Sequence, residues 1–79
     1  DLKQFNFSYY PNPTKGKLHL SALENIEDVE LVNLLGQNVL SEKLNSRNST
    51  LDISHLTKGI YIMKLSINGA VGAYKIIKE

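Results

Sequence analysis

The chain has no cysteine, so neither a disulfide nor a thiolate zinc site can stabilise its 79 residues. Nine lysines and arginines nearly balance eight aspartates and glutamates, which leaves a net charge of +1. This balance gives no electrostatic argument for binding nucleic acid or an anionic membrane. No apolar run approaches the ~20 residues of a transmembrane helix, and the first residues do not resemble a signal peptide. What remains is one small domain whose stability depends on its 42% hydrophobic residues.

The clearest local pattern is a hairpin within residues 59–77, centred on Asn68-Gly69. A two-residue type I′ turn needs positive φ at both central positions, which Asn and Gly favour. The turn fixes the register and predicts four core-facing pairs: Ile67 with Ala70, Leu65 with Gly72, Met63 with Tyr74, and Tyr61 with Ile76. The opposite face is mixed and carries Lys64 and Lys75. A shift of one residue would bury both lysines, so the turn and the pattern agree.

Five further strands are predicted upstream of this hairpin, in ranges 4–10, 18–20, 28–34, 37–44 and 51–53. Polar connections at 22–27 and 45–50 separate some of them. No segment has a convincing helical apolar period. Seven short strands, with turn signals about every ten residues, favour an all-β fold, namely a seven-stranded antiparallel immunoglobulin-like β-sandwich.

Turn residues mark the ends of the early strands. Pro11, Asn12 and Pro13 end the first strand, because proline cannot donate to a ladder and holds the preceding residue extended. Gly16 completes that turn. A second turn has Asn33 at its first position and Gly36 at its fourth, where each residue type is favoured.

Tyr61 has two interpretations. The spacing Leu56-x-x-Gly59-x-Tyr61 resembles the corner of immunoglobulin-like folds, where a tyrosine at the start of a late strand bonds to backbone a few residues upstream. The alternative is a core aromatic ring with a solvated hydroxyl.

Side chains suited to catalysis are few. His19 lies alone on an outward strand position, where a solvated imidazole is the simpler interpretation. Asp52, Ser54 and His55 contain the residue types of a hydrolytic triad, but neighbours on a strand end point apart and cannot form the required hydrogen bonds. We therefore predict no catalytic residue, no cofactor, no metal and no enzyme activity.

The charged clusters also have simple interpretations. Four acidic residues lack the ligand spacing of a calcium loop, which favours a solvated edge; they are Glu24, Glu27, Asp28 and Glu30. Asn6 and Asn48 begin glycosylation acceptor patterns, to which we give little weight. The basic group of Lys58, Lys64, Lys75 and Lys78 is either a lysine-guarded sheet or a docking surface.

Taken together, the motifs closely resemble the type A C-terminal sorting domains of cargo proteins of the type IX secretion system of Bacteroidota. The resemblance runs from Tyr10 to the last residue. Its parts, in order, are Tyr10-Pro11-Asn12-Pro13-Thr14 with Gly16, Val29-x-Leu31-x-Asn33-Leu34-x-Gly36 with Val39, Leu51-Asp52-Ile53-Ser54-x-Leu56, Gly59-Ile60-Tyr61, and Lys75-Ile76-Ile77-Lys78. One difference is Asn33, where the family often has Asp, although either residue can start the turn.

The resemblance implies a single sorting domain over residues 1–79, with the motifs in 10–79 and a leading segment in 1–9. Such domains follow a covalently linked cargo and are read by the outer-membrane translocon after the cargo reaches the periplasm. A sortase-like protease then usually removes them, and the cargo is secreted or joined to the cell surface. The resemblance also implies a domain that is not an enzyme. We expect a monomer.

We expect the translocon to read the terminal hairpin and its lysine-bearing face, through Gly59, Tyr61, Lys64, Lys75, Ile76, Ile77 and Lys78. A second set is expected to hold strand ends: Pro11, Asn12, Pro13, Gly16, Asn33, Gly36, Asn68 and Gly69. Two other functions stay open. A carbohydrate- or protein-binding module would show an exposed aromatic platform, for which Tyr10 is the least explained residue. A structural spacer should tolerate residues after it, whereas a sorting signal should end the protein.

Overall fold

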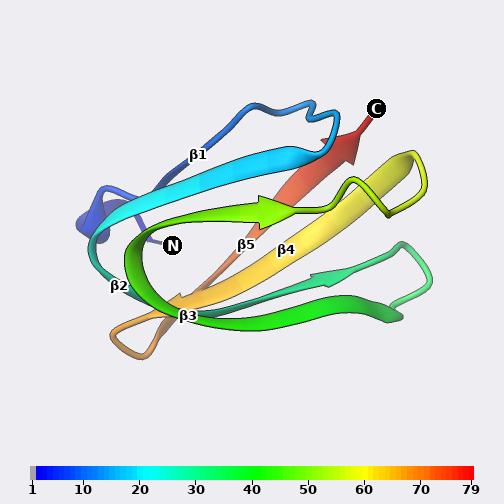
Figure 1. Cartoon of the computed structure of the whole chain (residues 1–79). Helices are drawn as coiled ribbons and strands as arrows, with labels where there is room; N and C mark the ends of the chain where they lie inside the picture. Colours follow the sequence, from blue (N-terminus) through cyan, green and yellow to red (C-terminus); the bar gives the residue numbers. More distant parts are fainter. Residues whose placement is uncertain (1) are drawn as a thin grey trace.

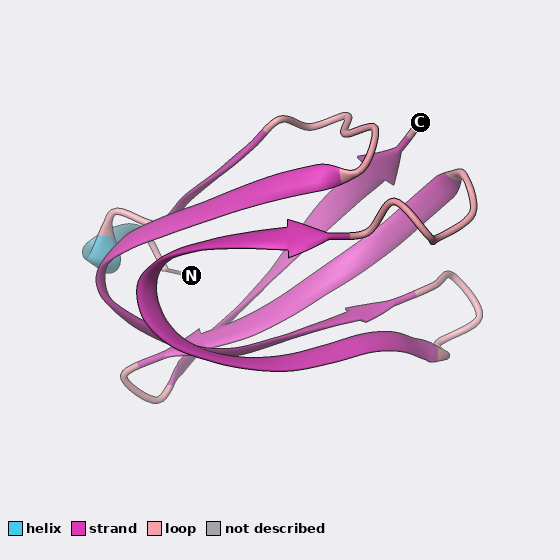
Figure 2. Ribbon diagram, viewed as in Figure 1, coloured by secondary structure: helices cyan, strands magenta, loops and turns pink. Residues whose placement is uncertain are grey.

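Strands form most of the chain over residues 2–79, the part described by a computed structural model (Figure 1, Figure 2). The elements are the 3-10 helix η1 (Lys3–Phe5) and the strands β1 (Ser8–Tyr10), β2 (Lys17–Val32), β3 (Asn38–Asp52), β4 (Gly59–Ile67) and β5 (Ala70–Lys78). None of the described residues belongs to a helix that is long and apolar enough to cross a membrane.

All strand pairs are antiparallel and follow the order β1-β2-β4-β5, with β3 also paired to β2. Figure 1 shows why β2 has three partners: β2 and β3 curve back together, so that the sheet folds over itself. The first part of β2 lies between β1 and the end of β3, whereas its last part lies between the start of β3 and β4. Register shifts between Ser21 and Asp28 coincide with this bend, as expected for bulges that curve a sheet.

The predicted count of seven strands is wrong, because residues 2–79 form five strands. The predicted strands 18–20 and 28–34 are one strand, β2, and 37–44 and 51–53 are one strand, β3. The polar stretches between them remain paired, as in Ser21 with Asn48 and Ile26 with Ser46. Polar side chains there face solvent around the bend, which removes the alternating pattern without breaking the backbone ladder. The prediction of an all-β antiparallel fold is confirmed.

The predicted first strand is also too long. Only Ser8–Tyr10 are in β1, since residues 3–5 form a helical turn that ends at Asn6 with φ 55°. Leu2, ahead of this turn, is buried and packs beside Gly72 of β5. A Cβ added to Gly72 would lie only 2.9 Å from the side chains of Leu2 and Tyr74. The rings of Phe7, Tyr9 and Tyr74 cluster with centroids 5.1–5.8 Å apart.

The hairpin prediction is confirmed in register and in orientation. Ile67 pairs with Ala70, Leu65 with Gly72, Met63 with Tyr74 and Tyr61 with Ile76. The turn residues have positive φ, 54° for Asn68 and 79° for Gly69. The hairpin contributes Tyr61, Met63, Leu65, Ile67 and Ile76 to the core. The other core residues are Leu18, Leu20, Ile26, Val29, Leu31 and Leu51 from β2 and β3, together with Leu2 and Ile53.

Tyr61 makes the predicted corner contact. Its hydroxyl donates a 2.6 Å hydrogen bond to the carbonyl oxygen of Thr57, while the ring is buried in the core. The corner interpretation, rather than a solvated hydroxyl, is therefore correct. This contact anchors the loop before β4 to the start of the strand.

Candidate functional site

The sequence motifs, although dispersed along the chain, lie at one end of the folded sheet. The loop of residues 11–16, the turn of 33–37, the loop of 53–58 and the end of β5 share this end, whereas the Asn68-Gly69 turn lies at the opposite end (Figure 1). Register agrees with this placement, since Lys17 pairs with Asp52 and Gly59 with Lys78. We call this region the motif end.

Asn12 connects the first motif to the last one. Its carboxamide Nδ2 donates to the carbonyl of Lys75 and its Oδ1 accepts from the amide of Ile77, both at 2.9 Å. The bonded residues are 63 and 65 positions away along the chain. Both peptide bonds that precede the flanking prolines, Pro11 and Pro13, are cis.

Thr14 continues this contact along β5. Its amide donates to the carbonyl of Ile77 at 2.9 Å, and its carbonyl accepts from the amide of Glu79 at 2.8 Å. The result is a parallel bridge between Thr14 and Lys78. The buried Thr14 hydroxyl also donates to the carbonyl of Lys17 at 2.6 Å and accepts from the amide of Gly16 at 3.1 Å. The loop is therefore fixed both to itself and to the end of β5.

Asn33 organises the second turn of the motif end. Its Oδ1 accepts from the amides of Leu35 and Gln37, both at 3.0 Å, and its Nδ2 donates to the Gln37 side chain at 2.8 Å. Gly36 has φ 83°, a left-handed conformation that costs glycine little. The turn predicted from Asn33 and Gly36 is present, closed by a 3.0 Å hydrogen bond from the Gly36 amide to the Asn33 carbonyl. Leu34 and Leu35, at the centre of the turn, are 70% and 84% exposed. The sequence pattern did not predict these two exposed leucines.

The residues expected to meet a translocon do not share one surface. Gly59, Lys64 and Lys75 are exposed, and Ile77 is partly exposed on the outer face of the hairpin. Tyr61 and Ile76 are core residues. Lys78 lies on the inward side and is only 8% exposed, so its grouping with the surface lysines is wrong. Strand alternation explains this, because Lys78 shares its side of β5 with Ile76.

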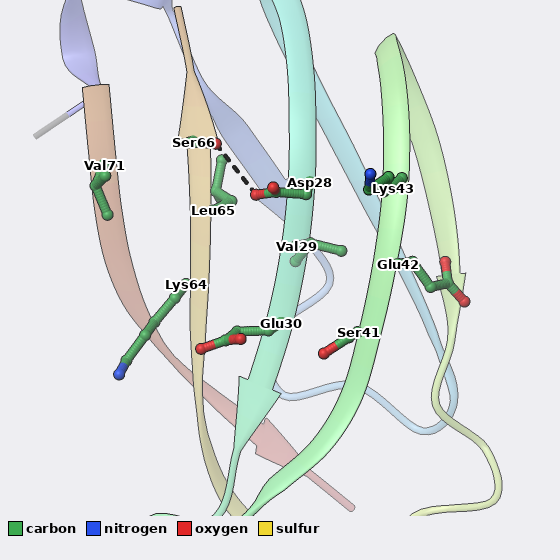
Figure 3. A pocket seen from close by; sticks show the side chains of 10 residues that line it. All are labelled: Asp28, Val29, Glu30, Ser41, Glu42, Lys43, Lys64, Leu65, Ser66 and Val71. Atoms are coloured by element: carbon green, nitrogen blue, oxygen red, sulfur yellow. Dashed lines mark hydrogen bonds between the residues drawn. The ribbon is translucent and has the colours of Figure 1, made fainter. Parts of the chain in front are cut away.

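The outer face of the hairpin is mixed in charge. Lys64 pairs across strands with Glu30 of β2, and Asp28 accepts a 3.1 Å hydrogen bond from Ser66. An open groove of about 640 Å³ lies over these strands. In Figure 3 the side chain of Lys64, one of the residues that line it, extends away from β2. Lys43 of β3 borders the same groove. Any partner of this face therefore meets both signs of charge.

A family model described as a secretion system C-terminal sorting domain matches residues 8–79. The chain belongs to this family. It is a C-terminal sorting signal for type IX secretion, recognised by the secretion machinery and attached to a cargo protein. Membership implies export across the outer membrane, into the medium or onto the cell surface. No curated protein matches the chain.

The acidic residues of the sorting domain have partners of their own. Glu24 lies 3.8 Å from Arg47, Glu30 accepts from Asn38 at 2.9 Å, and Glu27 accepts from the amide of Gly69 at 3.4 Å. Within residues 2–79 no group of acidic or histidine side chains could hold a metal ion.

The prediction that the side chains with triad chemistry point apart is wrong for Asp52 and Ser54, because these two are hydrogen-bonded to each other in a turn of the sorting domain. Asp52 Oδ1 accepts from the hydroxyl of Ser54 at 2.6 Å and from its amide at 3.0 Å, and Lys17 lies 3.2 Å from Oδ2. These hydrogen bonds from Ser54, more than the Lys17 charge, hold the pKa of Asp52 well below its usual range. His55 is exposed, and His19 bonds instead to the Thr50 hydroxyl at 2.9 Å. Sorting domains of this family are not catalytic.

The aromatic residues do not form a platform on the sorting domain. Tyr10 is 60% exposed and its ring lies against His19, with centroids 5.1 Å apart. Phe7, Tyr9 and Tyr74 are partly buried against the core. One exposed ring is less than a carbohydrate-binding module needs, and the family match does not favour that function.

Proposed function

We propose that the outer-membrane translocon recognises this sorting domain in its folded state, at the motif end and along the outer face of the β4–β5 hairpin. The observation that supports this is the gathering of separate motifs at one end of the sheet. Gly59, Lys64, Lys75 and Ile77 are accessible there and make the contact. Tyr61, Ile76 and Lys78 act indirectly, since they hold the strands in place from the inside.

We further propose the sequence of events that the resemblance implies. The cargo, joined ahead of residues 1–9, crosses the periplasm with this domain as a monomer attached behind it. The translocon reads the domain, a sortase-like protease cuts upstream of the motifs, and the cargo is released or joined to the cell surface. The turn residues Pro11, Pro13, Gly16 and Gly36 keep the motif end rigid enough to be read on unrelated cargoes.

We also infer that the folded-over sheet is a compact relative of the immunoglobulin-like sandwich. In support, the bends of β2 and β3 turn five strands into two layers, and the Tyr61 corner belongs to that architecture.

The test is an export assay with a fluorescent reporter fused ahead of residue 1, in a host with type IX secretion. Lys64→Glu and Lys75→Glu each change the charge of the outer face of the hairpin, and we expect export to fall in both. Arg47→Glu is the matched control: it makes the same charge change on β3, outside this groove and near Asn68 at the opposite end of the sheet. Equal export by all three variants and the parent chain would overturn the proposed surface.

A further inference from the structure

The last residues of β5 are bonded along both edges. On one edge, Tyr61 pairs with Ile76 and Gly59 with Lys78 in the ladder with β4. On the other edge, Ile77 uses its amide for Asn12 and its carbonyl for Thr14. Since alternate residues of a strand point their backbone groups to opposite edges, Ile76 is held by β4 and Ile77 by the loop.

Asn12 takes the place of a neighbouring strand. A carboxamide carries one carbonyl acceptor and an N–H donor, the same groups as a peptide unit. Asn12 presents both to β5, one to Ile77 and the other to Lys75, with good distances of 2.9 Å. Aspartate offers the acceptor without the donor, and serine or threonine is too short to span two residues. The site therefore suits asparagine in particular.

We infer that Asn12 is a positioning residue for recognition: it holds residues 75–79 as a strand occupied on both edges, so the machinery reads side chains and not a free backbone edge. This inference rests on the proposed function. It assigns the contact to Lys75 and Ile77, which point outward, because Ile76 and Lys78 are turned to the inside. It also excludes addition of a partner strand along 75–79.

The experiment compares Asn12→Ala and Asn12→Asp with the parent chain, and uses Asn25→Ala as the control because Asn25 is an exposed residue distant from the motif end. Asn12→Asp keeps the acceptor for Ile77 but sets an anionic oxygen against the Lys75 carbonyl. Three quantities are measured: amide hydrogen exchange of Ile77 and Ile76, the denaturation midpoint, and export of the fused reporter.

We expect exchange at Ile77 to rise about tenfold in Asn12→Ala, the effect of losing its hydrogen bond to Asn12, with Ile76 unchanged. In Asn12→Asp, repulsion between the carboxylate and the Lys75 carbonyl moves the side chain off β5, so exchange at Ile77 should rise there as well. Export should fall, while the midpoint should fall only slightly relative to the parent chain and Asn25→Ala, as for the loss of exposed hydrogen bonds, and Ile76 should stay protected. Acidification that protonates the carboxyl introduced by Asn12→Asp restores the donor, so the excess exchange of Ile77 in this variant should shrink below pH ~4.

Three results would overturn the inference. In the first, Ile77 exchanges faster but export is unchanged, so order at the chain end is not needed. In the second, Ile77 exchange does not change, so Asn12 does not provide the order. In the third, the midpoint falls and Ile76 loses protection together with Ile77, so Asn12 supports the whole fold. The proposed surface is judged separately, by Lys64→Glu and Lys75→Glu.

Discussion

Asn33 illustrates how one side chain shapes the motif end. Asn33→Ala removes the acceptor for the amides of Leu35 and Gln37, and we expect the free energy of unfolding to fall by about 1 kcal/mol. Asn33→Asp keeps that acceptor, and the Gln37 amide can rotate to donate to it. The second variant should therefore be close to neutral. Denaturant unfolding of both variants checks the prediction. An equal loss of unfolding free energy in the two variants would show that the side-chain acceptor of residue 33 does not stabilise the turn.

Asp52 predicts how stability depends on pH. Its pKa is lower in the folded chain than the ordinary value of 3.8, chiefly through the hydrogen bonds from Ser54. A depressed pKa stabilises the fold above the unfolded pKa, and this contribution is lost as the pH falls below ~4. Asp52→Asn should be less stable than the parent at neutral pH, and the difference should narrow in acid. A gap between the melting temperatures that stays constant down to pH ~2 would contradict this.

Some residue roles follow from sequence and others do not. Asn33 and Gly36 were predictable because their turn is local and has a known chemistry. The bonds of Asn12 were not, because the partners are 63 and 65 residues away and an asparagine between prolines reads only as a turn. The burial of Lys78 follows from alternation along β5, but its basic character and end position suggested a surface residue.

In the terminal hairpin, two glycines should resist substitution for different reasons: one because of its backbone conformation and the other because of close packing. Gly69 has φ 79° with open space around it, whereas an added Cβ at Gly72 would meet Leu2 and Tyr74 at 2.9 Å. We expect Gly69→Ala to cost about 1 kcal/mol through its backbone conformation and Gly72→Ala about 1–3 kcal/mol through overpacking.

A double-mutant cycle with Leu2→Ala separates these two causes. Removing the Leu2 side chain makes room for the Gly72 methyl group, so Leu2→Ala and Gly72→Ala together should cost less than the sum of their separate effects. The same change should be additive with Gly69→Ala. Additivity in both pairs, measured by chemical denaturation, would mean that Leu2 does not pack on Gly72 in solution.

The hairpin was predictable because its turn and its alternation are both local signals that support one register. The continuity of β2 and β3 was not. At their bends, exposed polar residues such as Glu24 and Arg47 look like loop residues, while pairing with a distant strand keeps the backbone extended. Similarly, the first segment alternates like a strand, but Asn6 turns the chain so that Leu2 reaches the core.

At the scale of the whole molecule, the early part of the chain packs against the last strand, β5. The loop of residues 11–16 and the end of β5 form one bonded unit at the motif end, and the N-terminal Leu2 packs beside Gly72 of the same strand. Sequence patterns identified the family and the all-β class, since these depend on motif order and alternation. They could not show that the motifs converge, because convergence depends on how the sheet bends.

The most direct test of the central claim is whether the chain alone directs export. A fluorescent reporter fused ahead of residue 1 is expressed in a host with type IX secretion and in the same host without its translocon. We predict that the reporter reaches the surface or the medium only in the first host, and stays in the periplasm in the second. Export that is equal in the two hosts, or absent from both, would contradict the account.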